Sequence, residues 1–139
     1  MVQPHIISDR NIWEQSSFKA LYFQSLLKNT DYVLCLSSAA EYLGMCSCTA
    51  GMDAYVLSVK ECRADNMEIA STDGIRHTSI SQTINDLLAD ETMDEQVIFE
   101  SLADQYFKNN YADINIMPDN RDAFNYFRPM AEMYYCSDI

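Results

Sequence analysis

The fold of this chain is decided by residues 74–88, Gly-Ile-Arg-His-Thr-Ser-Ile-Ser-Gln-Thr-Ile-Asn-Asp-Leu-Leu. Thr72-Asp73-Gly74 is a turn signal, and residues 75–78 predict a short strand directly after it. Ser79 with Gln82 three residues later matches a capping box, in which the serine hydroxyl accepts a free backbone N–H at a helix start. The predicted helix then has an inward side formed by Thr83, Ile84, Leu87 and Leu88.

Further strand signals precede this stretch. Residues 54–59 (Ala-Tyr-Val-Leu-Ser-Val) are rich in β-forming residues, and the weakly alternating residues 67–71 are suited to pair with them. Residues 32–36 form either another short strand or the entry to a helix. Together with residues 75–78, these segments predict a small mixed sheet confined to residues 32–78.

Two helices are expected before the strand at 54–59. Residues 11–29 carry apolar side chains with a period near 3.6, and Asp9 or Asn11 is placed to cap them. Ser38 and Glu41 have capping-box spacing, which predicts a short helix that stops at Gly44.

The C-terminal part is expected to be helical. Asp94 is placed to cap a helix that Asn109-Asn110 ends, and Pro118-Asp119 opens a last helix over about residues 120–135. Pro129 lies inside this last helix and is expected to kink it or split it near Phe127.

These elements predict an α+β fold, α/β in the broad sense, in which an N-terminal helix and about three C-terminal helices pack on the sheet. A length of 139 residues fits a single domain over residues 1–139. Within it we distinguish an N-terminal helix (1–30), a central region (31–107) and a C-terminal helix (108–139).

Composition excludes several classes of protein. The chain is 48% hydrophobic and 12% aromatic, which disfavours charge-driven disorder. It contains no run of 18 apolar residues, and its N-terminus lacks the apolar core of a signal peptide, so we expect no membrane span. The five cysteines are an odd number, which favours free thiols in a cytoplasmic location. Cys46-Ser47-Cys48 is too closely spaced for a zinc hairpin, so we expect neither a metal nor a cofactor.

The charge is concentrated in the second half of the chain. The formal net charge is −12, and residues 65–139 hold fifteen acids against four bases. Residues 86–104 contain seven acids and no lysine or arginine. This block is either the solvated side of two helices or an acidic docking surface for a basic partner, and it argues against direct nucleic-acid binding. The candidate partner-binding residues are Asp90, Glu91, Asp94, Glu95, Glu100 and Asp104.

Catalytic patterns are sparse. The sequence has no glycine-rich phosphate loop, no Gly-x-Ser-x-Gly elbow and no His-Glu-x-x-His. His5 lies near the terminus, and His77 is expected to be a partly exposed structural residue at a sheet edge. We therefore expect no enzyme; a small hydrolase or transferase that uses His77 with a nearby Asp or Cys is the alternative.

Residues 74–88 resemble the Gly-Ile/Val-x-x-Thr-Ser-x-x-x-Thr-Ile/Leu-x-Asp-Leu segment of AbiEi-like abortive-infection antitoxins. Residues 36–44 (Leu-Ser-Ser-Ala-Ala-Glu-Tyr-Leu-Gly) are similar to the family's Ser-Ala-Leu-x-x-x-Gly-Leu element, and a predicted strand follows in both. The order of parts matches over about residues 31–107. The positions that carry the motif are Gly74, Thr78, Ser79, Thr83 and Asp86.

The resemblance implies a non-enzymatic antitoxin of a type IV toxin–antitoxin system, which counters a nucleotidyltransferase-type toxin. It also implies a structural motif, in which Ser79 caps the helix while Thr83 and Asp86 tie it to the preceding strand. The chain departs from the family at residues 80–82, where relatives often have proline followed by Glu-Arg. Relatives typically carry an N-terminal winged-helix domain, so we expect this chain to correspond to the toxin-antagonising half alone. An acidic protein-binding module or a DNA-mimic inhibitor of a basic partner is the further alternative.

Overall fold

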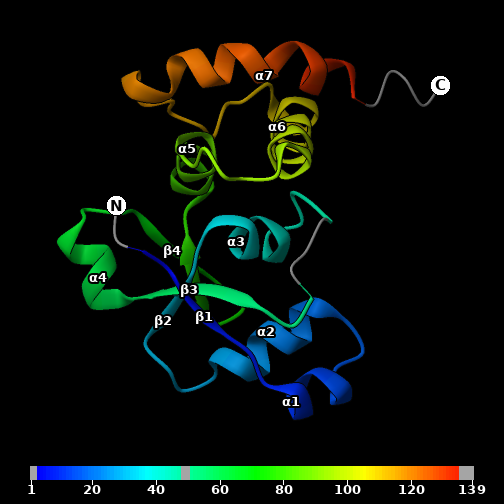
Figure 1. Cartoon of the computed structure of the whole chain (residues 1–139), viewed down its shortest axis with the longest axis vertical. Coiled ribbons are helices and arrows are strands. Elements are labelled where there is room, and N and C mark those ends of the chain that lie inside the picture. The colour runs from blue at the N-terminus through cyan, green and yellow to red at the C-terminus, as the bar shows by residue number, and fades with distance from the viewer. Residues whose placement is uncertain (1–2, 48–50, 135–139) are drawn as a thin grey trace.

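The computed structural model describes residues 3–47 and 51–134 and has a mixed α+β architecture, which confirms the predicted class (Figure 1). Its sheet has five strands in the order β1-β3-β2-β5-β4. All neighbouring strands are antiparallel except β2 and β5, which run parallel with Leu34 opposite His77. The strands are β1 (His5–Ile7), β2 (Tyr32–Leu34), β3 (Ala54–Ser58), β4 (Ile69–Thr72) and β5 (Ile75–Thr78).

The sheet extends beyond the predicted residues 32–78 because β1 joins its edge. In β1, Ile6 pairs with Tyr55 of β3, and the strand has only three residues. Two of these residues are exposed, so β1 lacks the alternation of apolar and polar positions that identifies a strand from sequence.

Helices cover both faces of the sheet. Figure 1 shows α1 and α2 on one side and α3, α5, α6 and α7 on the other. Leu34 and Val56 pack in the core beneath α2, whereas Val33 and Leu57 pack in the larger core that includes α5. The helices are α1 (Arg10–Gln15), α2 (Lys19–Leu27), α3 (Leu36–Tyr42), α4 (Val59–Ala64), α5 (Ile80–Ala89), α6 (Glu95–Asn109) and α7 (Arg121–Met133), with a 3-10 turn η1 (Pro118–Asn120) before α7.

Two helix predictions were wrong at their boundaries. The single helix predicted over residues 11–29 is broken into α1 and α2, because the backbone is extended at Ser16 and again at Phe18. Ser38 does not cap a helix: α3 starts two residues earlier, and the Ser38 hydroxyl accepts the backbone N–H of Tyr55 instead. The expected cap at Asp9 is present and accepts from Ile12.

The last predicted helix does not split at Pro129. Helix α7 runs without a break from Arg121 to Met133. Proline removes the N–H that would bond to the carbonyl of Asn125, and Asn125 lies on the exposed side of the helix, where water can satisfy that carbonyl. Within the described residues, no helix combines the length and apolar character needed to cross a membrane.

Helix α5 is fixed to the C-terminal segment by the buried amide of Asn85. Its Nδ2 donates to the carbonyl of Ser81 at 2.8 Å and to that of Asn115 at 3.0 Å. Its Oδ1 accepts from the backbone N–H of Met117 at 2.8 Å and from Asn120 Nδ2 at 3.0 Å. Both donors and both lone pairs of this one side chain are therefore used, so Asn85 holds the segment between α6 and α7 against α5.

We predict that Asn85→Ala lowers the free energy of unfolding by about 3 kcal/mol, because it leaves buried backbone groups without partners. Chemical denaturation monitored by circular dichroism measures the change. Asn125→Ala, on the exposed side of α7, is the matched control and should change stability by less than about 0.5 kcal/mol. Equal effects of the two substitutions would contradict the role of Asn85.

Candidate functional site

Residues 74–88, which carry the motif, form the turn, strand and helix start that their sequence predicts. Gly74 adopts a positive φ of 79° in the turn between β4 and β5, a conformation that glycine tolerates best. Ser79 caps α5, since its hydroxyl accepts the backbone N–H of Gln82 at 3.0 Å. The Gln82 side chain does not complete the capping box but accepts the backbone N–H of Glu68 at 3.1 Å. The motif thereby fastens the start of α5 to the chain before β4.

The two threonines of the motif join α5 to β5. Thr78 and Thr83 are fully buried, and their hydroxyl oxygens lie 2.7 Å apart. The Thr83 hydroxyl also lies within donating distance, 3.2 Å, of the Thr78 carbonyl. Thr83 thus makes the tie to the preceding strand that the resemblance implies.

Asp86 does not make the corresponding tie. Its Oδ1 accepts from Gln82 Nε2 at 2.9 Å, on the same helix, and its buried Oδ2 has no hydrogen-bond partner among the described residues. The residue is only 6% exposed. Burial, with a smaller contribution from the nearby Asp65, raises the pKa of Asp86 to about 6. A carboxylate in this position destabilises the fold at neutral pH.

His77 is buried rather than partly exposed, because β5 lies between β2 and β4 and is not the sheet edge that we expected. Its Nδ1 donates to the carbonyl of Thr78 at 2.8 Å, since that carbonyl can only accept. Its Nε2 lies 2.7 Å from the Thr72 hydroxyl, which can donate to it. Both ring nitrogens are therefore engaged in holding the β4–β5 hairpin.

The cysteines in the core have the character of small apolar side chains. Cys35 and Cys62 are free and buried, and burial raises the pKa of both thiols, that of Cys62 to about 11. A raised pKa lowers the thiolate fraction and hence nucleophilicity. No group of three potential metal ligands occurs among the described residues, while Cys48 and Cys136 lie outside them.

The structure divides the six candidate partner-binding acids into two sets. Asp90, Glu91, Asp94 and Glu95 lie at the junction between α5 and α6, where Asp90 accepts from Thr92 and Asp94 caps α6. Glu100 and Asp104 lie one turn apart along α6. Glu100 accepts from Ser47, and Asp104 pairs with Lys108 at 3.1 Å.

Two acids of the first set, Asp90 and Glu91, line a pocket of about 600 Å³, which we call the acid-rimmed pocket, whereas Asp94 and Glu95 do not line it. Asp90 and Glu91 form one wall of it. Apolar side chains line much of the rest, together with the polar residues Gln3, Ser37 and Thr92. One of the apolar residues, Ile6 of β1, is 58% exposed. These apolar lining residues are Pro4, Ile6, Leu36, Tyr55 and Met93.

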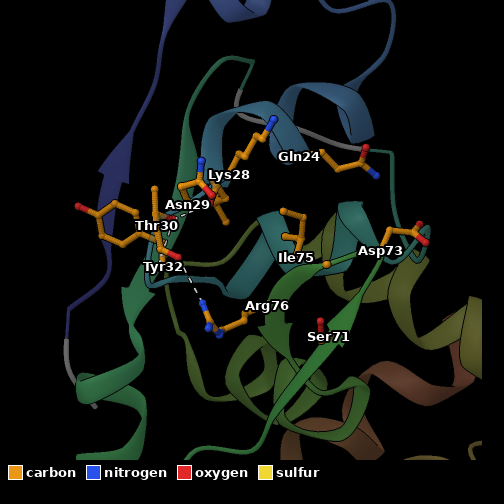
Figure 2. A pocket seen from close by; sticks show the side chains of 11 residues that line it. Gln24, Lys28, Asn29, Thr30, Tyr32, Ser71, Asp73, Ile75 and Arg76 are labelled. Atoms are coloured by element: carbon orange, nitrogen blue, oxygen red, sulfur yellow. Dashed lines mark hydrogen bonds between the residues drawn. The ribbon is translucent and has the colours of Figure 1, made fainter.

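A second pocket, of about 580 Å³, lies at the turns that follow α2 and β4 (Figure 2). Lys28, at the end of α2, and Arg76, on β5, both line it, and we call it the cationic pocket. The sequence does not identify this pair, because 47 residues separate Lys28 from Arg76. The one feature of the sequence that pointed to this pocket is that Arg76 lies within residues 74–88.

Comparison with known proteins gives no relatives for this chain. No protein-family model matches it, and neither a curated protein nor a solved structure shows significant similarity.

We predict that Asp86→Asn stabilises the protein at pH 7 by about 2 kcal/mol. The folded-state pKa of Asp86, about 6, lies above the ordinary value of 3.8, so the folded state binds more protons between these two values. The free energy of unfolding of the wild type relative to that of the variant therefore falls as the pH rises from about 4 to about 6. Below about pH 4 the two free energies of unfolding become equal.

Denaturation curves at pH 4 and pH 7 measure this difference. Asp122→Asn removes an exposed carboxylate of α7 and serves as the control, with a change below about 0.5 kcal/mol at both pH values. A gain from Asp86→Asn that is the same at pH 4 and pH 7 would show that the ionisation of Asp86 is not its cause.

Proposed function

We propose that this chain is a non-enzymatic, antitoxin-like domain that binds a basic protein partner and counters a nucleotidyltransferase-type toxin. The resemblance of residues 74–88 to AbiEi-like antitoxins supplies the class of partner. The free buried thiols of this chain suit a reducing compartment, so we propose that it acts in the cytoplasm.

The observation that carries this proposal is the position of the acid-rimmed pocket beside the open edge of the sheet. β1 is the end strand, and no strand of the described chain pairs with its outer side. Ile6 and Tyr55 lie opposite each other on β1 and β3, and both line the pocket. An open strand edge offers backbone hydrogen bonds to a partner segment, and the pocket offers apolar area next to them.

Charge selects the kind of partner that this surface suits. Glu91 is exposed and has no hydrogen bond or ion pair among the described residues, while Asp90 contributes a second carboxylate to the same wall. A lysine or arginine side chain can place its apolar stem on Ile6 and Tyr55 and its charged end at these carboxylates. A basic partner is therefore favoured over an acidic or neutral one.

The buried ionisable groups support a binding role over a hydrolytic one. Both ring nitrogens of His77 are engaged by threonine groups, so neither is held ready to accept a proton from a nucleophile. The thiols of Cys35 and Cys62 have raised pKa values, which disfavours the thiolate that a cysteine nucleophile requires.

We predict that Asp90→Lys/Glu91→Lys abolishes rescue of growth from a co-expressed nucleotidyltransferase-type toxin encoded beside this gene. It should also weaken binding to that toxin at least ~30-fold, which corresponds to about 2 kcal/mol. Glu91→Lys alone leaves the Asp90–Thr92 turn intact and should show a smaller loss in the same direction.

Glu14→Lys/Asp122→Lys makes the same change in net charge at exposed positions on α1 and α7, and it should rescue like the wild type. Circular dichroism establishes that each variant is folded. Full rescue by a folded Asp90→Lys/Glu91→Lys variant contradicts the proposed surface, and failure of the wild type to bind or rescue contradicts the antitoxin function itself.

A further inference from the structure

The backbone of β1 directs the polar groups of one residue, Ile6, to the open side of the sheet. In an antiparallel pair, the N–H and C=O of a residue point to the same side, and this side alternates along the strand. The Tyr55 carbonyl accepts the backbone N–H of Cys35 at 3.0 Å, and the Tyr55 N–H donates to the Ser38 hydroxyl at 2.9 Å. Both polar groups of Tyr55 therefore point away from β1, toward α3 and the end of β2.

Ile6 lies directly opposite Tyr55 and so exchanges no backbone hydrogen bond with it. The residues on either side, His5 and Ile7, are the ones whose N–H and C=O face β3. The N–H and C=O of Ile6 then point outward, and no hydrogen bond from the described residues reaches them. One donor and one acceptor at this position are therefore open to another chain.

The side chains of β1 alternate between the two faces of the sheet. Ile7 packs against the core beneath α2. Ile6 points to the opposite face, where it is exposed and lines the acid-rimmed pocket together with Tyr55. The open backbone groups and an uncovered apolar side chain thus belong to the same residue.

The open edge is short, which limits what can pair with it. β1 has three residues, and Pro4, directly before it, has no N–H to donate. Short edge strands and prolines restrict unwanted pairing between sheet edges in natural proteins. A segment that pairs with β1 therefore needs contacts besides backbone hydrogen bonds, and the acid-rimmed pocket supplies them.

Charge and strand periodicity together define the side chains that an added segment must carry. Alternate side chains of a strand point to the same face, so the residue opposite Ile6 and those two positions away project on the face of the pocket. Asp90 and Glu91 line this pocket, and no lysine, arginine or histidine does. Lysine or arginine at these alternate positions would meet two carboxylates, whereas a second copy of this chain, with a net charge of −12, would bring like charge.

We propose that the partner adds an extended segment to β1, with its backbone hydrogen-bonded to the N–H and C=O of Ile6 and with lysine or arginine at alternate positions facing Asp90 and Glu91. Strand addition of this kind draws affinity from main-chain hydrogen bonds and specificity from pockets for alternate side chains. The inference rests on the proposed function, and it adds the conformation and the residue pattern of the toxin segment that binds.

Ile6→Pro tests the backbone part of the proposal, with the nucleotidyltransferase-type toxin encoded beside this gene as the probe. Proline removes the outward N–H but no hydrogen bond to β3, and edge strands tolerate proline at such a position. Ile6→Ala is the matched control, since it keeps the N–H and removes more of the side chain than proline does. We expect Ile6→Pro to weaken binding about tenfold more than Ile6→Ala does in isothermal titration calorimetry.

Amide hydrogen exchange provides a second measurement that needs no variant. In the ¹⁵N-labelled free chain, the Ile6 amide should exchange as an open N–H, and unlabelled toxin should slow this exchange at least about tenfold. The amides of His5 and Ile7 are the internal reference, because they face β3 in the free chain and should change less.

The outcomes separate strand addition from the proposed function. Toxin binding by the wild type with equal affinities of folded Ile6→Pro and Ile6→Ala, or with unchanged exchange of the Ile6 amide, overturns strand addition and leaves the proposed function in place. No toxin binding by the wild type overturns the proposed function and strand addition with it. Circular dichroism shows whether each variant is folded, and where Ile6→Pro is not, the exchange of the Ile6 amide decides.

Discussion

The burial of α5 is the constraint on which the rest of the structure depends. This helix lies between the sheet and the C-terminal helices, so polar side chains on both of its sides are removed from water and must find partners. Thr83 meets this requirement toward β5, and Asn85 meets it toward the segment before α7. Asp86 meets it only in part, which explains why its pKa is raised. The segment between α6 and α7 is held in turn by its hydrogen bonds to Asn85 on α5.

The segments that the sequence predicted well are those whose structure is local. The turn at Gly74, the strand after it and the Ser79 cap depend on residues within a few positions of one another, and all three are present. The elements that were missed depend on distant partners. β1 exists because β3 pairs with it, and the Ser38 hydroxyl is taken by Tyr55 rather than by its own helix.

The same distinction applies to the candidate sites. Asp90 and Glu91 could be predicted as candidates from the charge of the sequence alone. The apolar residues that complete their pocket lie on or beside β1, α3 and β3, which the sequence did not place next to these acids. The cationic pocket could not be predicted, because its walls form only when α2 packs against the sheet. The result is a molecule with an acidic, partly apolar surface suited to a basic protein and, separately, a small cationic pocket.

Helix α5 joins the sheet and the C-terminal helices into one cooperative unit, and native-state hydrogen exchange tests this cooperativity most directly. We expect the slowest amides of β5, α5 and α7 to open with the same free energy, equal to that of global unfolding, because Asn120, the residue directly before α7, is hydrogen-bonded to the buried Asn85. If the slowest amides of α7 exchange through an opening of clearly lower free energy while α5 and β5 remain protected, the two parts unfold separately and the claim is contradicted.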